Sequence, residues 1–558
     1  MENITTDEPS VHDGNQTNGG PTQRFDTKDS VQNSGRFQWA VITSLALLII
    51  VGLGFRISHL GAISFAEDEV NKVDAVESYE RGDITANAEH PMLMKVLMFA
   101  SVKAGRALQS AGRHISDETL FRLPNAVVGA LTIIPLFLLT AAFFDRWTGL
   151  IAAGLWSGGI NAITFNRIGK EDTLLVFFML LAFYFYLRAK QISTKNVLAR
   201  RRHYILSGIS FGLMLASKYF PHYFGLNALY HHNVRVRKRE PDEPSGKTPP
   251  IFYVVFAVAF LVANPAVLLP QVWQYLDGYM GERLLVHTGY VFADHLYKNT
   301  VSRTPFWGTP LYFYLVFMAV KIPILVLVSF ITGLVVSTKR WRQPGYAFVL
   351  FMLFFWIVPY SLIGAKWLRY TLSLMPFVYM LSAVGVIELL RFVSSRIGGS
   401  KQARALVTAG VVAIFLGLPA WTAYSSSPHF ALYTNALGSG KTGYFFPHDE
   451  FYDDGLREAI EFVCKVAPPN AVIAHETPAA TRYYLKRFGR SDLNSKAISS
   501  PDFDVANISG PAYIIIQRGR TYFENREKIA LVRARFTKVD EISVNGMTAA
   551  EVFMNQTR

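Results

Sequence analysis

The sequence contains little charge and almost no cysteine. Charged residues make up 17% of its 558 residues and hydrophobic residues 51%, whereas soluble domains carry about 25% charged residues. The single cysteine, Cys464, excludes a disulfide scaffold, a cysteine-rich zinc module and an iron–sulfur centre, and we expect it to be a packed structural thiol. With 42 Phe, 26 Tyr and 9 Trp, the chain is also too aromatic to be disordered. This composition argues against a large soluble enzyme.

Long apolar runs dominate the sequence instead, and about 20 such residues suffice to cross a membrane as a helix. The first run, 39–55, begins too far from the start for a signal peptide and has no cleavage pattern after it, so we interpret it as a retained anchor. Residues 1–37 are polar without apolar periodicity, which predicts a disordered cytoplasmic tail. Further spans, about eleven in all, are predicted at 121–143, 148–166, 171–188, 204–219, 221–232, 251–269, 310–335, 346–364, 370–391 and 405–423.

The segment 204–232 is short for two crossings. It predicts a pair of half-length or tilted helices that is broken near Pro221. Polar groups on such broken helices are typical of transporters, and this pair carries Lys218 and His222.

The basic residues indicate which way the spans run. Four short loops, 188–203, 232–249, 336–345 and 391–404, hold 18 Lys and Arg residues and would all lie on one side of the membrane. The positive-inside rule makes that side the cytoplasm. The net charge of +14 is then mostly a topology signal, so nucleic-acid binding loses its main support.

This orientation places the other connections outside the cytoplasm. Residues 56–120 form a large first extracytoplasmic loop, in which 92–111 carries three basic residues and is expected to lie on the membrane surface. The loop 270–309 and the C-terminal part, 424–558, are also outside. We therefore expect a membrane domain over 38–423 followed by an extracytoplasmic domain.

The C-terminal part has the pattern of a small soluble α/β domain. Its amphipathic segments predict helices, and its short apolar runs predict buried strands. The helices are expected at 454–465, 477–486 and 522–533, and the strands at 471–474 and 512–517.

Charged residues cluster in the segments expected outside. The first loop opens with Glu67, Asp68 and Glu69, and adjacent acids gain from a cation, a helix N-terminus or a proton. A solvated loop is the alternative. Arg167 and Asp172 lie between two spans, where helix capping also explains an acid at the start of the next helix.

Two further clusters lie between spans. Lys366 and Arg369 either snorkel to lipid headgroups or bind a phosphate, for which the planar fork of Arg is suited. His287, Asp294 and His295 raise the question of a metal site, but their spacing favours ordinary loop histidines.

A carboxylate near the membrane interface with cations facing it suits a lipid-phosphate substrate. The carboxylate can take the proton of an attacking hydroxyl as a general base, and the cations can stabilise a departing phosphate. Phosphate is already a good leaving group, so no general acid is required. Direct displacement of a lipid phosphate from a sugar would use this surface.

Several motifs occur in a fixed order along the chain. They are Asp68-Glu69 with Tyr79 to Asp83, Glu89-His90-Pro91-Met92-Leu93-Met94-Lys95, Phe121-Arg122-Leu123-Pro124-Asn125, Arg167 with Asp172 and Leu174 to Phe178, Lys366 with Arg369-Tyr370, and Tyr433-Thr434-Asn435 with Asp453-Asp454-Gly455-Leu456. Together they resemble the family 39 glycosyltransferases of the GT-C fold, which include protein O-mannosyltransferases and lipid A aminoarabinose transferases. The resemblance covers about residues 37–465, and it departs from the family at Met92, where a second proline is usual.

The resemblance implies roles for the charged residues. Asp68 matches the catalytic acid, the base for the acceptor hydroxyl, and Glu69 matches its neighbour, which either tunes it or binds. Glu67 with Asp68 forms a second acid pair and leaves the register open. The resemblance also implies substrate-binding residues. They are Arg122, Lys366 and Arg369 facing the donor phosphate, Asp172 holding the site or the acceptor, His90 and Lys95 shaping the donor end of the first loop, and Arg167 without a more specific role.

These inferences predict an integral membrane glycosyltransferase. Its donor would be a polyprenyl-phosphate sugar, with mannose favoured, and its acceptor a hydroxyl of an exported protein. A lipid A or polysaccharide acceptor is the alternative, and a transporter is the alternative of a different class. No cofactor is required, although the acidic pair could hold Mg²⁺ or Mn²⁺ beside the phosphate. The outer loop at 270–309 has no room for the β-trefoil insert of eukaryotic members, which favours a bacterial inner membrane.

Overall fold

The computed structural model describes residues 27–110, 112, 114–237, 246–280, 289–298, 310–396 and 400–555, with side chains from residue 38 onward except 279 and 280. The predictions for residues 1–26 and for His287 lie outside this range. The chain divides into two compact units, Met1–Ser44 and Leu45–Arg558. Helix α1 (Thr27–Ile57) begins in the first unit and ends in the second. Residues 27–37, which we expected in a disordered tail, are therefore helical, because extending a formed helix costs little per residue.

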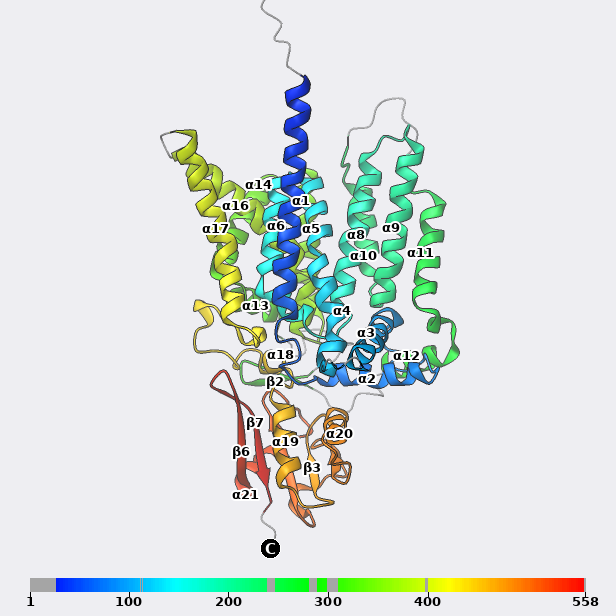
Figure 1. Cartoon of the computed structure of the whole chain (residues 1–558), viewed down its shortest axis with the longest axis vertical. Helices are drawn as coiled ribbons and strands as arrows, with labels where there is room; N and C mark the ends of the chain where they lie inside the picture. Colours follow the sequence, from blue (N-terminus) through cyan, green and yellow to red (C-terminus); the bar gives the residue numbers. More distant parts are fainter. Residues whose placement is uncertain are drawn as a thin grey trace, which may run out of the picture. The chain divides into compact units, whose positions relative to one another are not determined.

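The second unit is a bundle of helices with a small sheet domain beyond one end (Figure 1). The helices of the bundle and of the layer across its end are α1, α2 (Glu67–Glu80), α3 (Met92–Ser110), α4 (Asp117–Leu131), α5 (Ile133–Phe143), α6 (Arg146–Gly158), α7 (Ile160–Asn166), α8 (Asp172–Gln191), α9 (Val197–Ser217), α10 (His222–Asn233), α11 (Pro250–Ala263), α12 (Pro270–Met280), α13 (Phe313–Lys321), α14 (Ile324–Lys339), α15 (Pro344–Leu362), α16 (Met375–Arg396) and α17 (Lys401–Ser425). Short 3₁₀ turns η1 (Pro265–Leu268) and η3 (Leu368–Ser373) and a hairpin of β1 (Tyr290–Phe292) and β2 (His295–Tyr297) connect them.

Six helical segments of the described chain are long and apolar enough to cross a membrane, and α11 and α14 are shorter apolar helices. The six are Gln38–Ile57, Asp117–Phe143, Asp172–Gln191, Pro344–Leu362, Met375–Arg396 and Lys401–Ser425. The chain is therefore an α-helical polytopic membrane protein, as expected. Several other predicted spans are broken. The run 148–166 breaks at Gly159, and the run 310–335 breaks at Pro323, which cannot continue a helix.

The pair predicted over 204–232 is asymmetric. Helix α9 begins at Val197, seven residues before the predicted start, because Asn196 caps it through the Ala199 amide. Helix α10 is the short member, and it begins just after Pro221.

Close helix packing within the bundle depends on small residues. Gly333 of α14 faces the carbonyl of Leu381, and Gly385 of α16 faces the carbonyl of Ser329. A Cβ at either position would overlap the opposite backbone. Such contacts are the usual means of joining helices in lipid, where no hydrophobic effect drives them together.

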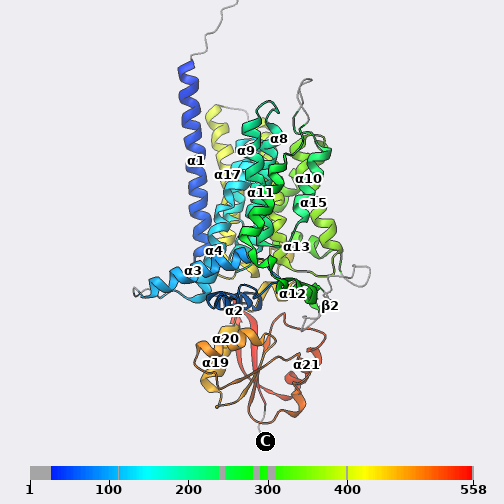
Figure 2. The ribbon, with the colours of Figure 1, turned by 90° about the vertical axis from the view of Figure 1, so that its right-hand side faces the viewer.

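Helices α2, α3 and α12 run across one end of the bundle, between it and the sheet domain (Figure 2). Helix α3 corresponds to the segment 92–111 that we expected to lie flat. It presents Met94, Met98 and Val102 to a buried core that also includes residues of α2 and of the sheet domain. This crossing layer carries the acids of the first loop.

The C-terminal domain contains a five-stranded sheet in the order β4-β3-β5-β7-β6, parallel at β4-β3-β5 and antiparallel at β5-β7-β6. Its elements are α18 (Pro447–Phe451), α19 (Leu456–Val466), β3 (Val472–Ala474), α20 (Pro478–Arg487), β4 (Asn494–Lys496), β5 (Ala512–Gln517), α21 (Arg526–Arg535), β6 (Thr537–Val544) and β7 (Met547–Met554). Alternate residues of β5 serve two cores: Tyr513 and Ile515 face α19 and α20, whereas Ile514 and Ile516 face α21. Cys464 of α19 packs against the first core.

The sequence pattern predicts most of this domain but neither β4 nor the last hairpin. The predicted strand 512–517 is β5, and the predicted helices correspond to α19, α20 and α21 with small shifts of their ends. Strands β6 and β7 are joined at Asn545-Gly546, both with positive φ, which is the turn that an Asn-Gly pair favours. The strand β6 is mostly exposed, so its hydrophobic alternation is weak.

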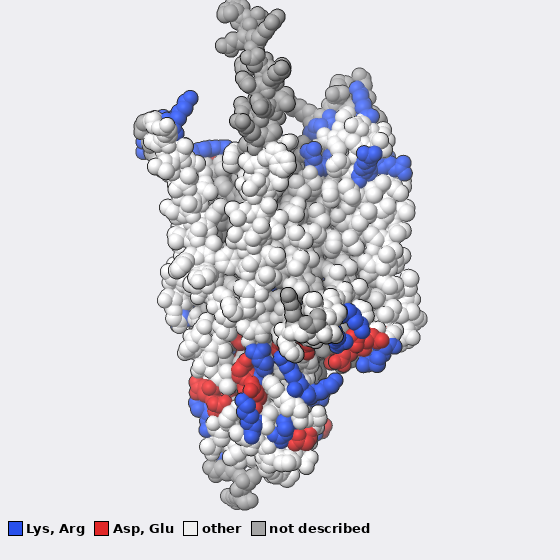
Figure 3. Space-filling view, viewed as in Figure 1, with Lys and Arg blue, Asp and Glu red and all other residues white. Residues whose placement is uncertain are grey.

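Charges are distributed unevenly over the surface. In Figure 3, the end of the bundle that holds the α8–α9 connection carries mainly Lys and Arg, and a broad uncharged band separates it from the opposite end. At that opposite end, both signs gather around the crossing helices and the sheet domain.

Candidate active site

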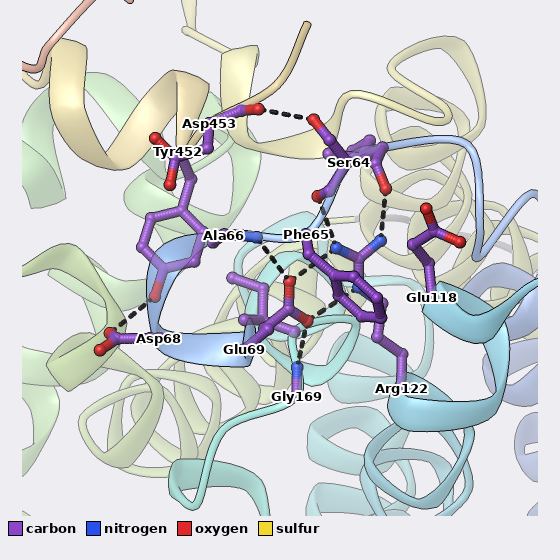
Figure 4. Close-up of polar contacts among 12 residues, drawn as sticks. Ser64, Phe65, Ala66, Asp68, Glu69, Glu118, Arg122, Gly169, Tyr452 and Asp453 are labelled. Atoms are coloured by element: carbon purple, nitrogen blue, oxygen red, sulfur yellow. Dashed lines mark hydrogen bonds and ion pairs between the residues drawn. The ribbon is translucent and has the colours of Figure 1, made fainter. Parts of the chain in front are cut away.

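The three consecutive acids form the first turn of α2, and each points to a different partner. Successive helical residues are rotated by about 100°, so three neighbours cannot share one partner. Glu67 lies against Arg520 of the sheet domain, Asp68 against Lys170 and Arg369, and Glu69 against Arg122. Figure 4 shows Asp68 and Glu69 diverging from the start of the helix.

Glu69 is a buried structural acid. Its Oε1 accepts hydrogen bonds from Arg122 Nε at 2.8 Å and the Gly169 amide at 2.7 Å, and its Oε2 accepts from the second Arg122 nitrogen at 2.6 Å and the Ala66 amide at 3.1 Å. Its side chain is 1% exposed. All four lone-pair sites of the carboxylate are thereby used, and Glu69 fixes the first loop to α4 and to the connection that follows α7.

Arg122 is used in the same way. Beyond its two bonds to Glu69, its guanidinium donates to the carbonyls of Leu60, Ile63 and Ser64. These contacts account for all five N–H groups of the side chain. Arg122 therefore holds the entrance of the first loop, and its contact with a donor phosphate, which the resemblance implied, stays a prediction.

Asp68 occupies a different environment. Its Oδ2 lies 2.9 Å from Lys170 Nζ and 3.2 Å from an Arg369 nitrogen, and it accepts a hydrogen bond from the Tyr452 hydroxyl at 3.0 Å. The Asp68 side chain is 32% exposed, whereas those of Lys170 and Arg369 are 4% and 13% exposed. Residues from three distant parts of the chain thus converge on one carboxylate that solvent still reaches.

The electrostatics keep this carboxylate ionised. Burial raises the pKa of Asp68, but the positive charges of Lys170 and Arg369 outweigh burial and hold that pKa well below its usual range. Burial in turn lowers the pKa of Lys170 to about 8, an effect that Asp68 only partly offsets. Lys170 is therefore a cation that can lose its charge near neutral pH.

Further ion pairs surround Asp68. Lys72, one turn along α2, donates to the Asp68 carbonyl at 3.1 Å and lies 3.0 Å from Glu171, which is fully buried. Asp172, at the start of α8, pairs with Lys218 at 2.6 Å. Lys218, which supported a transporter as the alternative, lies at the C-terminal end of α9 over the Tyr370 ring, so it belongs to this cluster.

Two other cations that we expected in the site, Lys95 and Lys366, bind backbone carbonyls. Lys95 donates to the carbonyls of Ala86, Asn87 and His90 and thus uses all three ammonium hydrogens. Lys366 donates at 2.7 Å to the carbonyls of Tyr360 and Ser361, near the end of α15. Both residues shape loops and do not contact Asp68.

Arg167 and His90 complete the set. The Arg167 guanidinium caps the C-terminal end of α1 by donating to four carbonyls, those of Phe55, Arg56, Ser58 and His59. His90 Nδ1 lies 3.9 Å from a Glu171 oxygen. Burial lowers the pKa of His90 well below its usual value, which leaves the imidazole neutral.

The sheet domain reaches the site through the turn Tyr452-Asp453. Both residues have positive φ, 44° and 65°, which is unfavourable for a side chain as large as tyrosine and is typically found where function requires it. The Asp453 carboxylate binds Arg520 through two nitrogens and accepts the Glu67 amide at 3.0 Å, and Arg520 also contacts Glu67 at 2.9 Å. This clamp ties the turn to the start of α2.

The donor set around Asp68 does not fit a divalent cation. Mg²⁺ and Mn²⁺ require several oxygen ligands, whereas the Asp68 carboxylate faces two cations within 3.2 Å. Within the described residues, no three His, Cys, Asp or Glu side chains gather as metal ligands. The positive charge at this site comes from the protein itself.

Lys170 and Tyr452 were missed by the sequence analysis. Lys170 lies between Arg167 and Asp172, so it could have been included as a third charge of that motif. Tyr452 is 384 residues from Asp68. Nothing in the local sequence marks it, because only the packing of the sheet domain on α2 brings it there.

Comparison with solved structures assigns the fold. The chain is similar to ArnT from Cupriavidus metallidurans bound to undecaprenyl phosphate, with a TM-score of 0.52 and 12% identity over 93% of this chain and 98% of that one. It is also similar to the oligosaccharyltransferase AglB from Archaeoglobus fulgidus, with a TM-score of 0.49 and 13% identity over 92% of this chain and 74% of that one. No curated protein has a matching sequence.

The chain is therefore a membrane protein with the GT-C fold, as the motifs predicted. Residues 107–269 match the family model described as dolichyl-phosphate-mannose-protein mannosyltransferase. The matched segment runs from the last turn of α3 through η1. It includes Arg122, Arg167, Lys170 and Asp172.

Proposed function

We propose that this protein transfers a sugar, mannose, from a polyprenyl-phosphate donor to a hydroxyl of an exported protein. The observation that carries the proposal is the partly exposed Asp68 carboxylate held between Lys170 and Arg369. A base beside cations is what displacement of a lipid phosphate requires. The membrane domain, 38–423, would bind the donor, and the domain 424–558 would complete the site.

In the proposed reaction, the acceptor hydroxyl gives its proton to Asp68 as its oxygen attacks the anomeric carbon. The bond from that carbon to the phosphate oxygen breaks, and its electron pair leaves with polyprenyl phosphate. Arg369 and Lys170 stabilise the negative charge on the departing phosphate. Since Asp68 Oδ2 already takes three contacts, Oδ1 is the oxygen we assign to the acceptor.

The family match over 107–269 supports mannose and a protein acceptor. The sequence motifs also resemble the aminoarabinose transferase group, which supports a lipid or polysaccharide acceptor as the second candidate. Both candidates use the same base and cations and differ only in the acceptor.

We also propose an orientation, with the site and the sheet domain outside the cytoplasm and the chain in a bacterial inner membrane. Support comes from the basic end of the bundle, which is opposite the site (Figure 3). The single cysteine allows a direct test: in a Cys464→Ser background, a membrane-impermeant maleimide should label Glu541→Cys in intact cells and should not label Arg202→Cys. The reverse labelling would contradict this orientation.

The activity test uses purified protein in nanodiscs with radiolabelled polyprenyl-phosphate mannose and an extract of membrane and periplasm. We expect label on protein with the wild type and none with Asp68→Asn. Asp74→Asn is the matched control, because Asp74 is exposed on the same helix. Label on lipid would select the second acceptor.

Two results would count against the proposal. Full transfer by Asp68→Asn would exclude Asp68 as the base. No transfer and no release of polyprenyl phosphate by the wild type, with several donor sugars, would favour a transporter.

A further inference from the structure

A cavity with basic residues in its wall lies at the basic end of the bundle, on the opposite side of the membrane domain from Asp68 (Figure 1). It has a volume of about 340 Å³, which falls within the range of small-molecule pockets. Its walls come from the start of α9 and from the segment that leads into α11. This cavity plays no part in the proposed reaction, so it requires an explanation of its own.

Within the part of the chain that the structure describes, the charged residues that line the cavity are all basic. They are Arg200, Arg201 and Lys247. Arg200 is held in place: its guanidinium donates to the Tyr204 hydroxyl at 3.2 Å and to the Lys247 carbonyl at 3.1 Å, and it lies over the buried Tyr204 ring. Preorganised cations of this kind favour an anion, and Arg favours a phosphate.

The start of α9 adds to these cations. Thr194, just before the helix, and Val197 and Arg200 of its first turn line the cavity. The positive end of the helix dipole therefore lies beside the basic wall and favours an anion there.

The opposite wall of the cavity is fixed to the bundle. The Thr248 hydroxyl lies 2.9 Å from the Tyr186 hydroxyl of α8, and Lys190 donates to the Gly246 carbonyl at 3.3 Å. The segment before α11 is thus tied to α8, so the cavity is part of the packed structure.

The apolar side of the cavity continues toward the lipid. Val197, Pro249, Pro250 and Ile251 line it. From there, Val254, Val258 and Val262 form a stripe down α11 and are 56%, 54% and 76% exposed. A basic pocket at the end of an exposed apolar stripe matches a phosphate headgroup with acyl chains, whereas a free phosphate would not use the stripe.

We propose that this cavity binds the headgroup of an anionic phospholipid, with its phosphate between Arg200, Arg201 and Lys247 and its acyl chains along α11. Basic pockets between membrane helices are a known type of site for such headgroups. The site does not depend on the proposed sugar transfer.

The test is native mass spectrometry of the purified full chain with dioleoyl phosphatidylglycerol or dioleoyl phosphatidylcholine, which share their acyl chains. We expect phosphatidylglycerol to be retained about tenfold more strongly, or about 1.4 kcal/mol, because the choline cation next to the phosphate of phosphatidylcholine is repelled by the basic wall. Arg201→Gln with Lys247→Gln should abolish this preference. Arg202→Gln with Lys401→Gln is the matched control, because both residues are exposed in the same basic region outside the cavity.

Equal retention of the two lipids by the wild type would overturn the proposal. It would also be overturned if the control variant lost the preference for phosphatidylglycerol as completely as the cavity variant, because that would indicate general charge attraction. Complete displacement of the lipid by millimolar inorganic phosphate would identify a free-phosphate site instead. If the double variant unfolds at a lower temperature than the control, the retention of the two lipids is measured again with the single variant Arg201→Glu.

Discussion

Replacing Glu69 with Gln separates the roles of the two neighbouring acids. Each Glu69 oxygen accepts two hydrogen bonds, so either orientation of the Gln amide turns its NH₂ group toward two donors. Two hydrogen bonds are lost and Arg122 stays buried without its counter-charge. Breaking a buried ion pair from one side costs about 3–5 kcal/mol. We therefore expect Glu69→Gln to lower the free energy of unfolding by about this amount.

The assay is thermal unfolding of purified protein, followed by tryptophan fluorescence, together with sugar transfer by the fraction that remains folded. Glu80→Gln is the matched control on the same helix, because Glu80 pairs at the surface with Lys103 and Arg106 and such pairs contribute about 0–1 kcal/mol. The unfolding temperature of Asp68→Asn should be closer to that of this control than to that of Glu69→Gln, since 32% of the Asp68 side chain is exposed to water.

One result would refute this reasoning. If Glu69→Gln unfolds with the control but transfers no sugar, while Asp68→Asn remains active, then Glu69 is the base and the register of the acids is shifted by one residue.

Three other predictions follow from the same contacts. Transfer should fall as pH rises through about 8, because Lys170 carries its charge below its pKa of about 8 and loses it above, and Lys170→Arg should move this fall to higher pH. Tyr452→Phe should lower kcat about tenfold, or about 1.4 kcal/mol, with KM unchanged, by removing the hydroxyl that orients Asp68; an unchanged kcat would exclude that role. Arg520→Gln should speed trypsin cleavage within 424–558 relative to the exposed control Arg526→Gln, because the buried Asp453 loses its partner; equal rates would show that the clamp is dispensable.

The Asp68 carboxylate and its partners illustrate what a cluster of charges in sequence can and cannot predict. The motif spacing identified Asp68, Glu69, Arg122 and Arg369 as a group, and the structure brings all four to the crossing layer around α2. The motif spacing did not predict which of these four residues bind backbone carbonyls and which surround the exposed carboxylate. Whether an Arg holds backbone or faces solvent depends on which carbonyls lie around it, as Arg122 and Arg167 show.

The sequence by itself determined the membrane character, the crossing helix α3 and most of the sheet domain. These follow from local hydrophobicity and periodicity, which act over a few residues. Only the tertiary structure decided which acid is buried and which stays partly exposed. The rotation of α2 sends Glu67, Asp68 and Glu69 to separate partners, and the sheet domain brings Tyr452 to Asp68 across 384 residues. Contacts of that range depend on packing of the whole chain and leave no local signal.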